Sequence, residues 1–188
     1  MAKTDICTMM TAITIVREKE MGTMEIMLVS PIQPIKIVIA KAIPYLLLSI
    51  INIISILLLS VFVLGVPVNG SLVLLIGESI LFIITCLSFG LLISSVTDSQ
   101  QTAMFISMMG LFLPTIMLSG FMFPVENMPL PLRVISNIVP SRWFYEIVLA
   151  VMIKGLGLSS IWKQTLILTG MTLFLLTLAI KKFKIRLE

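Results

Sequence analysis

Residues 42–77 read AIPYLLLSIINIISILLLSVFVLGVPVNGSLVLLIG, a run without a charged side chain. Two glycines, a proline and an asparagine interrupt this run between residues 65 and 70, and these residue types favour a turn. A helix of about 20 apolar residues crosses the hydrocarbon core of a bilayer, and each side of the turn provides that length. We therefore expect two membrane-spanning helices, over 43–64 and 72–96.

Two further apolar runs, 102–122 and 162–180, bring the number of predicted spans to about four. The composition agrees, because 59% of the 188 residues are hydrophobic and only 12% are charged. So few charges cannot cover the surface of a soluble fold, which excludes a soluble enzyme, and the hydrophobicity excludes a disordered chain. Lipid offers the backbone no hydrogen bonds, so the spans must be helical. The predicted fold class is an all-α polytopic membrane protein, with one membrane domain over 1–188.

The two ends of the chain set its expected orientation. The stretch 1–16 is apolar from Ile6 to Val16, too short to cross, and we interpret it as the end of a span whose beginning is absent from this sequence. The segment 17–41 and the tail 181–188 lie on the same side of four spans. Basic residues mark the cytoplasmic side of membrane proteins, so we expect both segments to face the cytoplasm. These two segments carry Arg17, Lys19, Lys36, Lys41, Lys181, Lys182, Lys184 and Arg186.

The segment 17–41 is too charged to span and too apolar for a plain loop. Methionines recur in it at helical spacing opposite Glu18 and Glu25, which predicts a short amphipathic helix, and Pro31 favours its end. Helices that lie on lipid carry mainly basic residues on their polar face, whereas three glutamates oppose two basic residues in this predicted helix. This favours docking on a protein partner, and the alternative is a solvated connector.

The stretch 123–161 is divided by four prolines into two short apolar pieces, 132–138 and 143–154. Neither piece is long enough to cross the bilayer. We expect them to form a re-entrant or interfacial helical hairpin on the outer side, before the last span at 162–180.

These two regions together resemble type-2 ATP-binding cassette (ABC) transporter permeases. The first region matches the family pattern in Arg17-Glu18-Lys19-Glu20, Gly22-Thr23, Glu25 and Ser30-Pro31. The second matches it in Leu118-Ser119-Gly120-Phe121, Phe123-Pro124, Asn127-Met128-Pro129 and Pro140-Ser141-Arg142-Trp143-Phe144. The resemblance runs from about residue 13 to the end, in matching order, and lacks the family's amino-terminal portion.

The resemblance implies a transport subunit of a bacterial or archaeal inner membrane, which hydrolyses no ATP itself. A separate ABC ATPase would bind ATP and magnesium, and a second permease, identical or different, would complete the pathway. A periplasmic or membrane-fusion adaptor is a further candidate partner, and nucleic acid is not. The residues implied to couple to the ATPase are Glu18, Glu20, Gly22, Thr23, Glu25 and Pro31. Those of the outer hairpin, which would cap the exit, are Phe123, Pro124, Asn127, Pro129, Pro140 and Arg142.

Polar side chains within the spans are candidates for the pathway or for helix contacts. They are Asn52, Glu78, Thr85 and Ser88. Small polar residues more often join helices than touch substrate. The chain has no histidine, no paired carboxylates and no phosphate-binding glycine loop, so we predict no catalytic or metal site. Two alternatives stay open: an ion-coupled secondary transporter using Glu78, and a truncated or accessory membrane protein. The substrate is not indicated.

Overall fold

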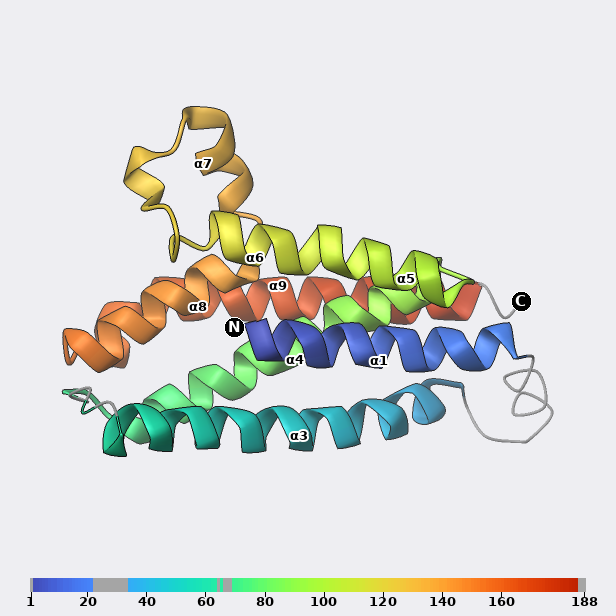
Figure 1. Ribbon diagram of the computed structural model, residues 1–188, viewed down its shortest axis with the longest axis horizontal. Coiled ribbons are helices and arrows are strands. Elements are labelled where there is room, and N and C mark those ends of the chain that lie inside the picture. The colour runs from blue at the N-terminus through green and yellow to red at the C-terminus, as the bar shows by residue number, and fades with distance from the viewer. Residues whose placement is uncertain (1, 22–33, 64, 66–68, 186–188) are drawn as a thin grey trace.

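The computed structural model describes residues 2–21, 34–63, 65 and 69–185, and its regular elements are all helical (Figure 1). The long helices are α1 (Ala2–Glu20), α3 (Pro34–Phe62), α4 (Leu72–Val96) and α9 (Leu158–Ile185). The shorter elements are α5 (Gln100–Ser107), η1 (Met108–Phe112), α6 (Leu113–Leu118), η2 (Val125–Asn127), α7 (Leu130–Ser136), α8 (Pro140–Val148) and η3 (Leu149–Ile153).

Four helical stretches of the described chain are long and apolar enough to cross a membrane, which confirms the predicted all-α polytopic fold. They are Ala40–Phe62, Leu72–Val96, Gln100–Leu118 and Leu158–Lys182. The C-terminal end of α9 lies at the same end of the bundle as the end of α1 and the start of α3 (Figure 1). This is the end that we predict to face the cytoplasm.

The observed bounds differ from the predicted ones at several ends. Helix α3 begins at Pro34 instead of residue 43, so that Pro44 lies inside it, and α9 begins at Leu158 instead of 162. The third span is not one regular helix, because the π-helix η1 precedes Pro114. A wider turn accommodates the missing N–H and the bulk of a proline ring. This span ends at Leu118 instead of 122, and Gly120 then turns the chain with a φ of +88°.

Helix α1 is continuous through Glu20, so residues 17–20 belong to it. The prediction that they belong to a separate amphipathic helix is therefore wrong. The remainder of that predicted helix, 22–30, falls outside the described residues. Ala12 and Val16 of α1 are fully buried against Ile93 of α4 and Ala103 of α5. Although the apolar stretch 6–16 is short, it is thus an integral part of the bundle.

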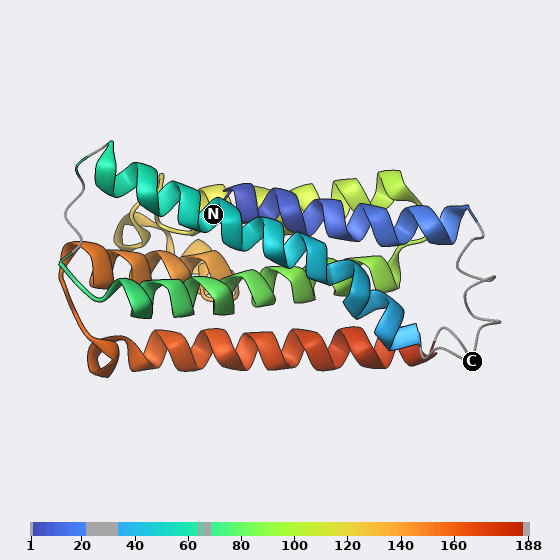
Figure 2. The ribbon, with the colours of Figure 1, turned by 90° about the horizontal axis from the view of Figure 1, so that it is seen from below.

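Helix α4 runs obliquely through the middle of the bundle, between α3 and α9 (Figures 1 and 2). The ring of Phe82 on α4 stacks on that of Phe144 on α8, with ring centroids 4.3 Å apart and planes 2° from parallel. Leu75, Phe82, Ile147 and Leu168 are at most 1% exposed and belong to one apolar core. Helices α4, α8 and α9 therefore form the packed centre of the fold.

Gly90 lets α4 approach α1 very closely. A Cβ atom at this position would lie 2.8 Å from the backbone oxygen of Thr8, whereas a Cβ at Gly77 of the same helix would meet nothing within 4 Å. A clash with backbone cannot be relieved by turning a side chain. The absence of a side chain at Gly90 therefore sets the distance between the two helices.

We predict that Gly90→Ala destabilises the bundle by about 1–3 kcal/mol, the usual cost of forcing extra volume into a packed site. Gly77→Ala is the matched control, and its effect should lie between zero and a gain of about 1 kcal/mol, since alanine is the better helix former. Unfolding in mixed micelles, followed by circular dichroism, measures both. Equal stability of the two variants would contradict the close approach of α1 and α4.

Candidate functional site

The last turn of α1 contacts three other helices. The Glu18 carboxylate pairs with the Lys41 ammonium on α3, and Lys19 donates to the backbone oxygen of Ser94 near the end of α4. Glu20 Oε2 accepts from Gln100 at the start of α5, from its side-chain nitrogen at 2.7 Å and its backbone nitrogen at 3.4 Å. We call Glu18, Lys19 and Glu20 the α1 clasp.

Helix electrostatics favour two of these contacts. The carbonyl end of a helix carries partial negative charge and its amide end carries partial positive charge. Lys19 is a cation at the carbonyl end of α4, and Glu20 is an anion at the amide end of α5. Glu20 also binds a backbone N–H that has no partner within its own helix. The clasp therefore joins the end of α1 to α3, α4 and α5.

The structure gives the predicted coupling residues two different placements. Glu18 and Glu20 bind side chains of neighbouring helices; the Glu18 side chain is only 26% exposed, whereas Glu20 is exposed. The others lie outside the described residues; they are Gly22, Thr23, Glu25 and Pro31. Sequence reasoning missed Lys41 and Gln100 as the partners of these acids, although the charge of Lys41 at a span boundary is a signal that could have found the first of them.

The predicted outer hairpin consists of α7 and the continuous α8–η3 helix, which are bent by 83° relative to one another. Its second arm differs from an interfacial helix, because Phe144, Ile147 and Val151 are buried in the core with α4 and α9. The first arm projects sideways from the bundle (Figure 1) and exposes apolar side chains such as Leu130 and Ile138. The hairpin thus re-enters the bundle through α8.

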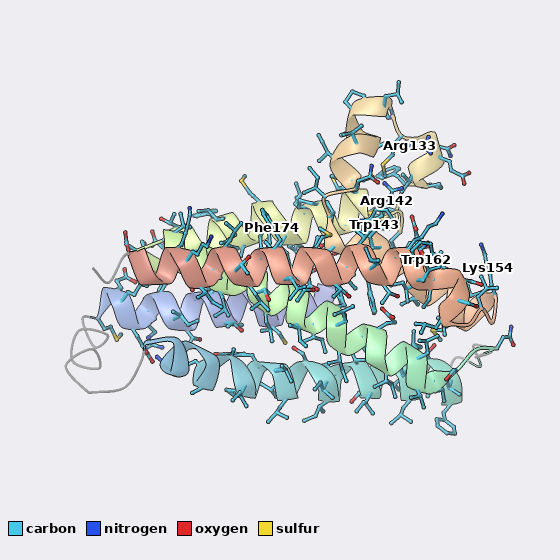
Figure 3. All side chains as sticks on the ribbon, turned by 180° about the vertical axis from the view of Figure 1, so that it is seen from behind. Arg133, Arg142, Trp143, Lys154, Trp162 and Phe174 are labelled. Carbon is cyan, nitrogen blue, oxygen red and sulfur yellow. The ribbon has the colours of Figure 1, made fainter. Side chains whose placement is uncertain are left out.

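Arg142 ties the two arms of the hairpin together. Its Nη1 donates to Ser136 Oγ at 2.7 Å, to Asn137 Oδ1 at 2.5 Å and to the backbone oxygen of Arg133 at 3.4 Å. Its Nε also pairs with Glu146 Oε1 at 3.4 Å. Figure 3 shows Arg142 and Trp143 where the projecting arm joins the bundle. One planar guanidinium therefore holds the end of α7 against the start of α8.

The prolines of the hairpin mark the beginnings of its helices. Pro124 and Pro129 immediately precede η2 and α7, and Pro140 is the first residue of α8. Phe123 and Asn127 are exposed, as are the first two prolines, whereas Pro140 is buried. The candidate residues of the hairpin therefore form an exposed group before α7 and a second group, with the buried Pro140, at the start of α8.

The polar residues of α4 lie against neighbouring elements. Glu78 is 5% exposed, and its Oε1 accepts from the Thr165 hydroxyl of α9 at 2.8 Å. The Thr85 hydroxyl lies 2.6 Å from that of Thr172, also on α9. Ser88 donates to the backbone oxygen of Ile84 within its own helix. Glu78 and Thr85 thus hold α4 to α9.

Asn52 lies elsewhere, on the side of α3 that faces the bundle. With Ser49 and Ser60 it lines a cavity of about 280 Å³ that is bordered by α1, α3, α4, α8 and η3 and by Phe121. Within the described part of the chain, no three His, Cys, Asp or Glu side chains come close enough to hold a metal ion. Of the four candidate polar residues, Asn52 lines this cavity, and Glu78, Thr85 and Ser88 do not.

The comparison with protein families matches residues 6–181 to the family described as "ABC-2 family transporter protein". The chain belongs to this ABC-2 family. The resemblance expected from the sequence motifs is thereby confirmed.

Individual ABC-2 relatives come from Escherichia coli K12. The chain is 39% identical over 152 residues to YbhS and 35% identical over 154 residues to YbhR, which are both named probable multidrug ABC transporter permeases. It is 30% identical over 182 residues to YhhJ, named an inner membrane transport permease. The matches cover 81%, 82% and 96% of this chain but only 40%, 42% and 48% of the relatives. No solved structure matches the chain.

We predict that Arg142→Ala releases α7 from the bundle, because charge-assisted hydrogen bonds contribute about 1.5–3 kcal/mol. Arg142→Lys should restore little, since an ammonium lacks the planar fork that reaches several acceptors. Arg133→Ala is the control, because only the backbone oxygen of Arg133 takes part. Hydrogen exchange at residues 130–138 should speed up in the first two variants alone. Unchanged exchange in Arg142→Ala would contradict this role.

Proposed function

We propose that this chain is the membrane-spanning permease part of an ATP-driven exporter. A separate ATPase subunit binds ATP and magnesium, and a second permease copy or relative completes the pathway. The relatives named as probable multidrug and inner membrane permeases support this proposal, as does membership of the ABC-2 family. The chain spans less than half the length of these relatives.

The observation that carries the proposal is the α1 clasp. Residues 21–33 connect α1 to α3, and the clasp holds the α1 side of this connection to α3, α4 and α5. A displacement of this connection by an ATPase would therefore act on several helices together. In this mechanism Glu25 docks on the ATPase, while Glu18 and Glu20 transmit the movement inside the permease.

The outer hairpin is the second functional element of the proposal. It lies near the end of the bundle opposite the clasp, and Arg142 keeps its projecting arm in place (Figure 3). We assign it the role of capping the exit of the pathway, next to a periplasmic or membrane-fusion adaptor where one is present. Ion-coupled transport through Glu78 has less support, because this carboxylate is engaged by Thr165 between two helices.

The docking role is tested with tagged chain purified from bacterial membranes. An ABC ATPase should co-purify with it, and Glu25→Lys should remove that ATPase or uncouple its hydrolysis from the permease. Recovery of the folded chain without any ATPase would overturn the proposal. Export that continues after ATP depletion but stops with a protonophore would instead favour ion coupling.

The transmission role is tested by exchanging the charges of one clasp contact. Glu18→Lys and Lys41→Glu should each impair coupling, because like charges then face each other across α1 and α3. The double exchange should restore it, with an interaction energy of about 0.5–3 kcal/mol between the two positions. Substrate-stimulated hydrolysis by the co-purified ATPase is the measurement. A double variant as impaired as the sum of the single ones would contradict a transmitting contact between these residues.

A further inference from the structure

The cavity beside α3 has a buried floor and an exposed rim. Ser49 and Leu75 are 2% and 1% exposed, whereas Ile56 and Phe121 at the rim are 41% and 70% exposed. The cavity is therefore open on the side where α3 meets Phe121. The span of α3 is only 6% buried within the described bundle, and we infer that this exposed side, with the opening, faces the hydrocarbon of the bilayer. A molecule dissolved in the membrane can reach it from the side.

The chemistry of the walls selects against charge. None of the side chains that line the cavity is ionisable at neutral pH, and apolar groups such as Ile53, Leu75 and Phe144 predominate. Taking a charge into such surroundings costs several kcal/mol unless a counter-charge meets it. The volume of about 280 Å³ lies just below the roughly 300–1,000 Å³ of pockets for drug-sized ligands. The cavity therefore fits a compact, uncharged molecule.

One polar group in the floor has an unmet hydrogen bond. Serines in helices commonly donate to the backbone oxygen four residues earlier, as Ser79 and Ser55 do here at 2.7 and 2.8 Å. The buried Ser49 hydroxyl has no hydrogen-bond partner among the described residues. A buried hydroxyl without a partner is costly. A ligand that offers a donor or an acceptor to Ser49 would remove that cost.

From these observations we propose that the cavity is a substrate site for compact, uncharged, mainly aromatic or aliphatic molecules that carry one hydrogen-bonding group. Such a molecule enters from the bilayer, packs against Ile53 and Phe144 and bonds with Ser49. Since the assignment as substrate rests on the proposed export function, binding and ATPase coupling have to be measured separately.

The probes are N-phenyl-1-naphthylamine, which is neutral and has one N–H, and 1-anilinonaphthalene-8-sulfonate, which has the same ring system with a sulfonate. Each dye is added stepwise to the chain in nanodiscs, and binding is followed by the fluorescence of the directly excited dye. Ile53→Trp fills the cavity, and Ile54→Trp puts the same bulk on the 42% exposed neighbouring position. Ser49→Ala removes the unpaired hydroxyl, and Ser55→Ala removes an exposed one outside the cavity.

The neutral dye should bind saturably, with affinity lowered at least about tenfold by Ile53→Trp and about threefold to tenfold by Ser49→Ala. The two control variants should bind like the original chain, and the sulfonate should show no binding that Ile53→Trp removes. Equal binding to Ile53→Trp and Ile54→Trp in folded protein would overturn the site. If an ATPase co-purifies but the dye binds equally to both tryptophan variants, only the cavity proposal fails. If the dye binds as expected but no ATPase is found, the substrate assignment falls together with the proposed function.

Discussion

The close packing of α4 against its neighbours is the constraint on which the rest of the structure depends. Lipid is as apolar as the side chains of the spans, so burial of apolar area alone gives little force between helices in a membrane. Here the helices are joined by backbone proximity at Gly90, by stacking of Phe82 on Phe144 and by the hydroxyl pair of Thr85 and Thr172. Each contact depends on shape or hydrogen bonding, which remain effective in lipid.

Because α4 fixes the centre, the two ends of the bundle have different roles. At one end the clasp pairs side-chain charges with helix termini and with Lys41. At the other end Arg142 holds a hairpin whose projecting arm exposes apolar side chains. In the proposed transport function, the clasp is the connection on which an ATPase acts, and the hairpin caps the place where substrate leaves.

The polar residues within the membrane fall into two groups. On α4, Glu78 and Thr85 bond across to Thr165 and Thr172 of α9. Those on α3 border the cavity, where Ser49 keeps an unpaired hydroxyl. From sequence alone the two sets look alike, since both recur at helical spacing. Their difference arises from the neighbour that each face meets, and this assigns one set to stability and the other to a ligand.

The sequence by itself determined the all-α class and a number of about four spans, because charge-free runs of membrane length have no other stable structure in lipid. It also determined the family, through the motifs at 17–31 and 118–144. It also placed the start of α4 at Leu72 and its end at Val96, since residues that favour turns act locally. Only the tertiary structure decided that Glu18 and Glu20 bind within the bundle, that α8 enters the core and that Asn52 faces a cavity. These outcomes depend on contacts between residues far apart in the chain, and hydrophobic periodicity carries no information about which helix a given face will meet.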